Sequence, residues 1–221
     1  MDKDKEIEYF NKMSEMLYSG IISDILDEMG VRNQVISPST GIKPLNRDWV
    51  MVGRAKTLYN EPDINMEDPY DLAIVTMDKL ENNQITVSGG ETNYESIMGE
   101  LSGHRMRLRG CRGCLINGYT RDAKQLIKMN FPVFCKGTTP IDTTGRVRVV
   151  DLDVPIPFGN KIISPGEIVF ADFDGIIVIP KECEEEVIVK SLKRFEEESQ
   201  VRQELREGKS MKDVWDKYHI M

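Results

Sequence analysis

The chain has 221 residues, of which 40% are hydrophobic and 30% charged, and its formal net charge is −8. This composition is typical of a globular protein with a sizeable core, and without a Pro/Gly/Ser-rich linker we expect one domain over residues 1–221. The acidic balance argues against direct nucleic-acid binding, which needs clustered Lys and Arg. We expect the local basic cluster at residues 104–112 to be a solvated helix face.

The N-terminus and the cysteines indicate the compartment. Acids are mixed with the first lysines and no apolar run follows them, which is not typical of an export signal. No stretch approaches the roughly 20 apolar residues that a membrane-spanning helix needs. We therefore expect a cytoplasmic protein with no membrane partner, in which the four cysteines stay reduced.

Helices are predicted at the start of the chain. Apolar residues spaced by three and four predict a helix over residues 7–29, interrupted at Ser19-Gly20. A second helix is predicted to begin at Ser23-Asp24, which are good capping residues, and to end at Gly30. A strand, a loop and a short helix are predicted next, at residues 50–58, 61–68 and 69–79.

Strands and helices then alternate. The predicted order is strand, helix, strand, helix and strand, at residues 84–88, 97–109, 114–117, 122–129 and 132–135. This βαβαβ order predicts a largely parallel sheet. An Asp174-Gly175 pair between two apolar runs indicates a hairpin. With N-terminal helices at about residues 5–30 and a C-terminal helical extension at about residues 182–218, the fold class is α/β with mixed sheets.

Two segments could bind a small anionic substrate. Gly99-Glu100-Leu101-Ser102 starts a predicted helix, where free N–H groups and the helix dipole can hold a carboxylate. Gly118-Tyr119-Thr120-Arg121-Asp122 follows a predicted strand, at the edge where open α/β sheets place their ligands. Arg121 could bind a carboxylate in a bidentate way, and Asp122 could bind a hard cation. The simpler interpretation is an N-terminal capping acid beside a surface Arg.

Other kinds of site lack their usual context. Cys111 and Cys114 have CxxC spacing but lead into a strand and have no second pair. With two His in the chain, oxygen ligands and hence Mg²⁺ or Mn²⁺ are favoured for any metal site. No glycine-rich nucleotide loop and no G-x-S-x-G elbow follows a predicted strand.

The joint pattern resembles the RraA-like family over about residues 17–208. The matching segments, in order, are Ile22-Ser23-Asp24-Ile25-Leu26-Asp27, Gly99-Glu100-Leu101-Ser102, residues 113–122, Pro132-Val133-Phe134, residues 165–172 and residues 174–180. That family joins 4-hydroxy-4-methyl-2-oxoglutarate aldolases to the RraA regulators of ribonuclease E. The resemblance implies an α-β-β-α sandwich of the swivelling β/β/α type, assembled as a trimer or hexamer with sites between subunits.

The resemblance also implies roles for particular residues. In the aldolases, the residue matching Arg121 holds the pyruvate part of the substrate, and the residue matching Asp122 anchors Mg²⁺ or Mn²⁺. Glu100, Leu101 and Ser102, after Gly99, match the carboxylate-binding segment. Because a C-terminal Glu of the adjacent subunit also belongs to the family site, Glu198 is the expected contribution from a neighbouring chain.

Some positions depart from the family pattern. Asn117 stands where the family usually has an acid, and His104 with Arg105 replaces small residues. Residues 60–69 are expected to lie over the site. These differences bear on the distal group of the substrate more than on the metal chemistry.

The leading functional hypothesis is a metal-dependent lyase that cleaves a 4-hydroxy-2-oxo acid to pyruvate and also decarboxylates oxaloacetate. The cation would stabilise the enolate that both reactions form, with Arg121 and Glu100 as the catalytic candidates. A non-catalytic regulator that binds a ribonuclease or another protein is the alternative. A menaquinone methyltransferase is a third hypothesis, against which the missing glycine loop argues.

Overall fold

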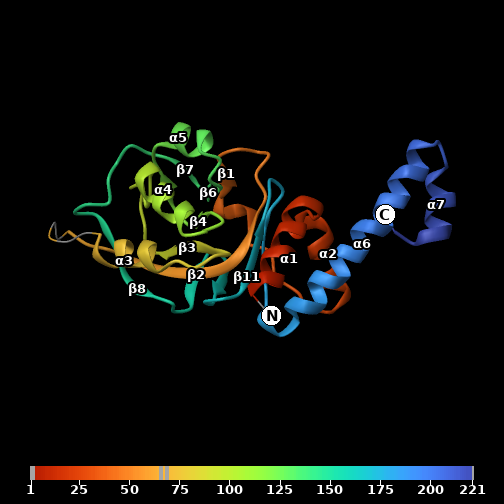
Figure 1. Ribbon diagram of the computed structural model, residues 1–221, viewed down its shortest axis with the longest axis horizontal. Helices are drawn as coiled ribbons and strands as arrows, with labels where there is room; N and C mark the ends of the chain where they lie inside the picture. Colours follow the sequence, from red (N-terminus) through yellow and green to blue (C-terminus); the bar gives the residue numbers. More distant parts are fainter. Residues whose placement is uncertain (1–2, 65–66, 68–69, 221) are drawn as a thin grey trace.

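The computed structural model describes residues 3–64, 67 and 70–220, and its ribbon is shown in Figure 1. The α-helices are α1 (Lys3–Met16), α2 (Ser19–Glu28), α3 (Asp71–Lys79), α4 (Glu100–Leu108), α5 (Ala123–Lys128), α6 (Glu184–Arg206) and α7 (Met211–Tyr218). The strands are β1 (Lys43–Pro44), β2 (Met51–Pro62), β3 (Gln84–Gly90), β4 (Cys114–Ile116), β5 (Tyr119–Thr120), β6 (Val133–Cys135), β7 (Gly137–Thr138), β8 (Val147–Leu152), β9 (Ile156–Phe158), β10 (Lys161–Ile163), β11 (Ile168–Ala171) and β12 (Ile176–Ile179).

The main sheet is mixed, with the order β1-β6-β4-β3-β2-β11-β12 and with β8 paired to the far end of β2. Strands β2, β3, β4 and β6 run parallel, which confirms the parallel sheet predicted from the βαβαβ order. Strands β11 and β12 form the antiparallel hairpin predicted from Asp174-Gly175. Two small ladders, β9–β10 and β5–β7, complete the described strands. The predicted α/β fold with mixed sheets is therefore confirmed.

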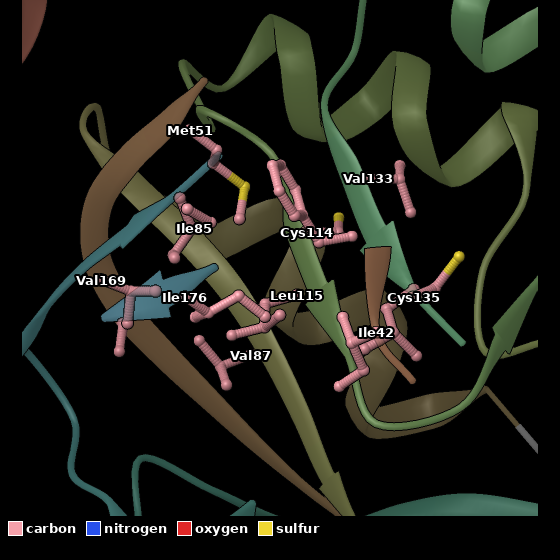
Figure 2. Packing of buried hydrophobic residues seen from close by; sticks show 14 of the residues in the cluster. Ile42, Met51, Ile85, Val87, Cys114, Leu115, Val133, Cys135, Val169 and Ile176 are labelled. Atoms are coloured by element: carbon pink, nitrogen blue, oxygen red, sulfur yellow. The ribbon is translucent and has the colours of Figure 1, made fainter. Parts of the chain in front are cut away.

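The hairpin strands are buried on both faces, and alternation sends successive side chains into two different cores. Along β11, Ile168 and Phe170 pack among the N-terminal helices, whereas Val169 and Ala171 pack into the larger core under the parallel strands. Figure 2 shows part of the larger core, in which Val169 and Ile176 lie with residues of β3 and β4. Burial on two faces explains why these strands are continuous apolar runs.

The helices lie on two sides of this sheet. In Figure 1, α3, α4 and α5 surround the parallel strands, whereas α1, α2 and α6 lie together beyond β11. The far half of α6 extends away from the sheet and carries α7 at its end. No described helix is both long and apolar enough to cross a bilayer. The prediction that the chain is one domain with terminal helical extensions stays a prediction.

Several predicted boundaries differ from those in the structure, and three of the differences have a clear cause. The first helix ends at Met16 and α2 begins at Ser19, because Asp172 accepts the backbone N–H of Ser19 at 2.7 Å and so caps the helix from the hairpin. Residues 61–62, predicted as loop, belong to β2 because they pair with β8. Helix α4 begins at Glu100 and not at residue 97, because residues 97 and 98 bond to the segment at 119–121.

Candidate active site at the start of helix α4

Asp122 directly precedes α5 in sequence, but its side chain lies at the N-terminus of α4. It has a left-handed backbone (φ 57°) just before α5, yet its side chain makes no capping bond to α5. Instead, Oδ2 accepts the backbone N–H of Glu100, the first residue of α4, at 3.1 Å. The carboxylate is therefore held at the positive end of α4.

Backbone pairing brings these two segments together. Residue 97 donates its N–H to the carbonyl of Tyr119 at 2.9 Å. The Met98 carbonyl accepts both the N–H of Arg121, at 3.0 Å, and the Thr120 hydroxyl, at 2.8 Å. These bonds fix the start of α4 against the Arg121-Asp122 pair.

Gly99 makes the close approach possible. A Cβ at this position would lie 2.5 Å from Asp122 Oδ2 and 2.9 Å from Arg121 Cγ. Both distances are shorter than real Cβ contacts, so any larger residue would push the two side chains away from the helix tip. The glycine is needed here for space, because its φ of −145° is ordinary extended backbone.

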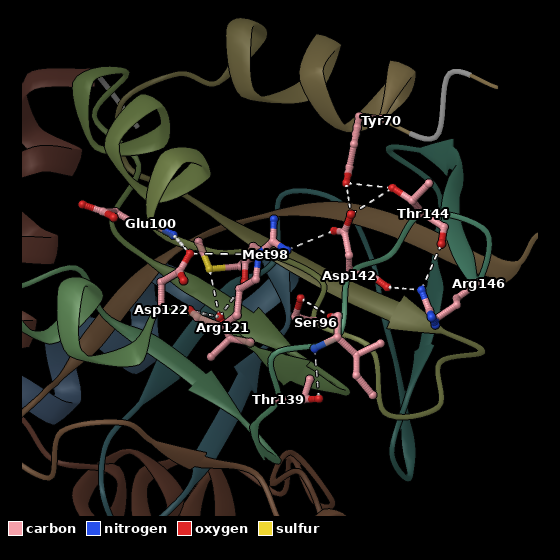
Figure 3. A network of polar contacts seen from close by, with 12 residues as sticks. Tyr70, Ser96, Met98, Glu100, Arg121, Asp122, Thr139, Asp142, Thr144 and Arg146 are labelled. Atoms are coloured by element: carbon pink, nitrogen blue, oxygen red, sulfur yellow. Dashed lines mark hydrogen bonds and ion pairs between the residues drawn. The ribbon is translucent and has the colours of Figure 1, made fainter. Parts of the chain in front are cut away.

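The guanidinium of Arg121 lies between two carboxylates (Figure 3). Its Nη1 is 3.3 Å from Asp142 Oδ1, and its Nε is 4.0 Å from Asp122 Oδ2. The Arg121 side chain is 40% exposed, so part of the group remains open to a ligand.

Asp142 was not predicted from the sequence. Its Oδ2 accepts the hydroxyl of Tyr70 at 2.7 Å and that of Thr144 at 2.9 Å. Partial burial acts to raise the pKa of Asp142, but these hydrogen bonds and the charge of Arg121 outweigh it and hold the pKa below its usual value. The charged form of the acid is thus stabilised beside the guanidinium.

Arg121 and Asp122 line a surface pocket of about 580 Å³, together with Ala123, Thr138, Thr139 and Pro140. The Asp122 side chain is 42% exposed. Among the described residues its Oδ1 has no protein partner, and no group of three or more His, Cys, Asp or Glu side chains is arranged to hold a metal. One carboxylate open to a pocket fits a hard cation such as Mg²⁺, which keeps several waters and takes further oxygens from a substrate.

Glu100 contributes its backbone rather than its side chain at this point. Its carboxylate points away from Asp122 (Figure 3) and lies 3.4 Å from His104 Nε2. The next two N–H groups, of Leu101 and Ser102, have no acceptor within the described part of the chain. The helix tip therefore keeps two free donors after the N–H that Asp122 accepts, although neither residue lines the pocket, and their role in binding a carboxylate stays a prediction.

Comparison with known proteins gives the family. The RraA-like family, described as Aldolase/RraA, matches residues 21–178. The chain belongs to the RraA-like family. A relative from Halalkalibacterium halodurans named "Putative 4-hydroxy-4-methyl-2-oxoglutarate aldolase" is 31% identical over 78% of this chain and 77% of its own length.

Two further comparisons set the extent of the likeness. Protein DlpA of Legionella pneumophila is 26% identical over 90% of this chain, but the chain spans only 32% of that protein. The crystal structure of Streptomyces coelicolor RraAS2, an unusual member of the RNase ES inhibitor RraA protein family, superposes with a TM-score of 0.75 at 24% identity. The superposition covers 88% of this chain and 98% of RraAS2. The RraA-like fold expected from the sequence is thus confirmed.

Glu198 lies in another part of this RraA-like chain. It is on α6, where it accepts hydrogen bonds from Tyr18 and from Arg202, the latter at 3.1 Å. In Figure 1, α6 lies beside α1 and α2, on the other side of the sheet from α4 and α5. A single chain does not bring Glu198 to Arg121 and Asp122, and its contribution across subunits stays a prediction.

The cysteines form no disulfide, and two arginines of the basic cluster contact groups of the same chain. All four cysteines are free thiols, and burial raises the pKa of Cys111 to about 11, so little reactive thiolate forms at neutral pH. In the basic cluster, Arg105 pairs with Asp78 at 2.7 Å and Arg109 donates to the Leu80 carbonyl at 3.1 Å.

Of the segment expected over the site, residues 60–62 belong to β2, and residues 65–66 and 68–69 lie outside the described part.

Proposed function

We propose that this RraA-like chain is a divalent-metal-dependent lyase that releases pyruvate from a 4-hydroxy-2-oxo acid, such as 4-hydroxy-4-methyl-2-oxoglutarate, and also decarboxylates oxaloacetate. The observation that carries the proposal is that Arg121 and an open carboxylate oxygen of Asp122 line one pocket, beside the α4 tip. The name of the H. halodurans relative supports the same chemistry.

The proposed roles follow from the donors present. Asp122 would hold Mg²⁺ or Mn²⁺ through its open oxygen, and the bound cation would supply Lewis acidity to the carbonyl and carboxylate oxygens of a 2-oxo acid. Arg121 would bind the substrate carboxylate with the part of its guanidinium that Asp142 does not occupy. The free N–H groups of Leu101 and Ser102 would add donors on the helix side.

Aldol cleavage and decarboxylation make the same electronic demand on these residues. In each reaction the C3–C4 bond breaks, its electron pair forms the C2=C3 bond of the pyruvate enolate, and negative charge develops on the C2 oxygen. C4 leaves as a carbonyl compound, with loss of the 4-hydroxyl proton, or as CO2, and the enolate takes up a proton at C3 to give pyruvate. Arg121 and the positive end of α4 would stabilise that charge as it develops. We propose further that the chain works as a homo-oligomer, in which Glu198 reaches the pocket of a neighbouring copy.

A pyruvate-release assay tests this proposal. Purified protein is supplied with oxaloacetate or with 4-hydroxy-2-oxo acids, in Mg²⁺, in Mn²⁺ or in excess chelator, and pyruvate is measured by coupled reduction to lactate. We expect turnover with either metal and its loss in chelator and in Asp122→Ala. Full activity of Asp122→Ala would rule out the role given to that acid.

A regulator is the second candidate, because the family description joins aldolases to RraA. Such a protein would bind a ribonuclease and inhibit it without turning over a 2-oxo acid. Inhibition of a purified ribonuclease by the chain, combined with no pyruvate release under any condition above, would favour it.

A further inference from the structure

Asp142 has hydrogen-bond partners in addition to its ion pair with Arg121. Its carboxylate accepts the hydroxyls of Tyr70 and Thr144, at 2.7 and 2.9 Å. An exposed Arg–Asp pair normally adds little, because two flexible side chains must be ordered to form it. Here the hydrogen bonds from Tyr70 and Thr144 order the acid independently of Arg121.

The backbone around Asp142 is fixed as well. Ser96 donates both its N–H and its hydroxyl to the Ile141 carbonyl, at 2.9 and 2.7 Å. Arg146 Nη1 donates to the carbonyl of Asp142 itself, at 3.2 Å. Figure 3 shows contacts that reach Asp142 and its backbone from Tyr70, just before α3, from Ser96, before α4, and from the loop after β7.

The two acids contact different nitrogens of the Arg121 guanidinium. Asp142 is 3.3 Å from Nη1, while Asp122 is nearest to Nε, at 4.0 Å. The ion pair at Nη1 restrains the group and leaves the edge formed by Nε and Nη2, of which Nε is the nitrogen nearest to Asp122. Arginine can bind a carboxylate through two parallel hydrogen bonds with this edge or with its two Nη atoms, and because Nη1 is paired with Asp142 this edge is the one left for a ligand.

We propose that Asp142, held by Tyr70 and Thr144, is a positioning residue that fixes the orientation of the Arg121 guanidinium, so that its Nε–Nη2 edge receives the substrate carboxylate next to Asp122. This inference rests on the proposed function for the identity of the ligand. Asp142 itself does not touch the reacting atoms. Its negative charge opposes an anionic ligand, so its benefit lies in orientation and not in attraction.

That division of effects gives a kinetic signature. In Asp142→Ala the arginine loses its fixed orientation but also its competing counter-ion. We therefore expect kcat to fall by about 10- to 100-fold, because small misplacements of a positioning group have effects of that order, while KM for oxaloacetate stays the same or falls. Asp142→Asn keeps an acceptor oxygen in place, and we expect it to restore kcat to within about threefold of wild type.

Two further variants complete the series. Tyr70→Phe removes one of the hydroxyls that hold the acid and should lower kcat in the same direction, by a smaller factor. Asp78→Ala is the matched control, because it removes the acid of an Arg–Asp pair with Arg105, at 2.7 Å, that does not line the pocket. The control should leave kcat and KM unchanged.

A readout without turnover separates this inference from the proposed function. In wild type the side-chain Nη resonances of Arg121, assigned by their loss in Arg121→Lys, should be separate in ¹⁵N spectra because rotation of the guanidinium is hindered. They should merge in Asp142→Ala and stay separate in Asp142→Asn and Asp78→Ala. Merged resonances in wild type, or unchanged ones in Asp142→Ala, would overturn the positioning role whether or not the chain releases pyruvate.

The kinetic outcomes are decisive in the same way. A kcat for Asp142→Ala within about twofold of wild type, or a rise in KM with no fall in kcat, would contradict the inference. If wild type releases no pyruvate from any 2-oxo acid, the proposed function fails, and the resonances of Arg121 alone decide the positioning role.

Discussion

Two aspartates of this chain cap helices that are distant from them in sequence, and they differ in how many donors they receive. Asp172, in the β11–β12 hairpin, accepts the N–H and the hydroxyl of Ser19 at the start of α2, together with the N–H groups of Asp174 and Gly175. It is buried, with 8% exposure. Asp122 accepts one N–H, from Glu100, and its side chain is 42% exposed.

The difference separates a structural acid from a candidate functional one. A buried carboxylate whose oxygens are all engaged holds two elements together and has nothing left for a ligand. A carboxylate that uses one oxygen on a helix tip and opens the other to a pocket is positioned and still reactive. The same local feature, an acid at a helix N-terminus, therefore has two meanings that only the count of its partners tells apart.

The largest effect is expected for turnover in Asp122→Ala. The loss of the proposed cation anchor should lower pyruvate release by at least about 1,000-fold, in line with the several kcal/mol that a metal contributes to a transition state. Stability should change by only about 1 kcal/mol, the usual loss for one capping bond. The pyruvate-release assay and urea unfolding measure the two effects, and a large loss of stability would make Asp122 a structural residue like Asp172.

Asp172→Ala should show the opposite pattern. Removing this acid leaves the buried donors around Ser19 without an acceptor, so the free energy of unfolding should fall by about 3 kcal/mol. Turnover per folded molecule should be unchanged. Urea unfolding by circular dichroism measures the first effect, and an unaltered midpoint would contradict the structural role.

Two glycine substitutions test whether a side chain can be accommodated beside Asp122 and in the hairpin that carries Asp172. In Gly99→Ala the new Cβ would lie 2.5 Å from Asp122 Oδ2, so the acid must move, and we expect kcat/KM to fall by about 10- to 100-fold. Gly175→Ala, at the hairpin, meets no atom within 4 Å and should be silent. Equal activity of the two variants would mean that the tight contact at Gly99 does not matter.

Many elements of the fold could be predicted from the sequence, because apolar periodicity reports burial directly. The two runs around Asp174-Gly175 indicated the hairpin, and the βαβαβ order indicated the parallel strands. The start of α2 at Ser19 could not be predicted, because the acid that caps it is 153 residues away in the chain. Asp142 was missed for the same reason, since its partners Tyr70 and Arg121 come from distant loops and nothing near it in sequence distinguishes it from a turn residue.

The smallest expected effect concerns acid titration. The lowered pKa of Asp142 means that its contacts add stability above the ordinary Asp pKa of 3.8, and that this contribution is lost as pH falls through the lower folded value. The difference in melting temperature between wild type and Asp142→Asn should therefore be present at pH 7 and shrink below about pH 4. Calorimetry across pH measures it, and a difference that grows on acidification would contradict the assignment.

Binding of Mn²⁺ tests the central claim most directly, because it requires no knowledge of the physiological substrate. Titration followed by the electron paramagnetic resonance of free Mn²⁺ should show that wild type binds the ion and that pyruvate tightens the binding. Asp122→Ala should bind it at least about tenfold more weakly, a loss of about 1.4 kcal/mol, whereas Asp78→Ala should match wild type. Equal Mn²⁺ affinity in Asp122→Ala, with or without pyruvate, would contradict the account.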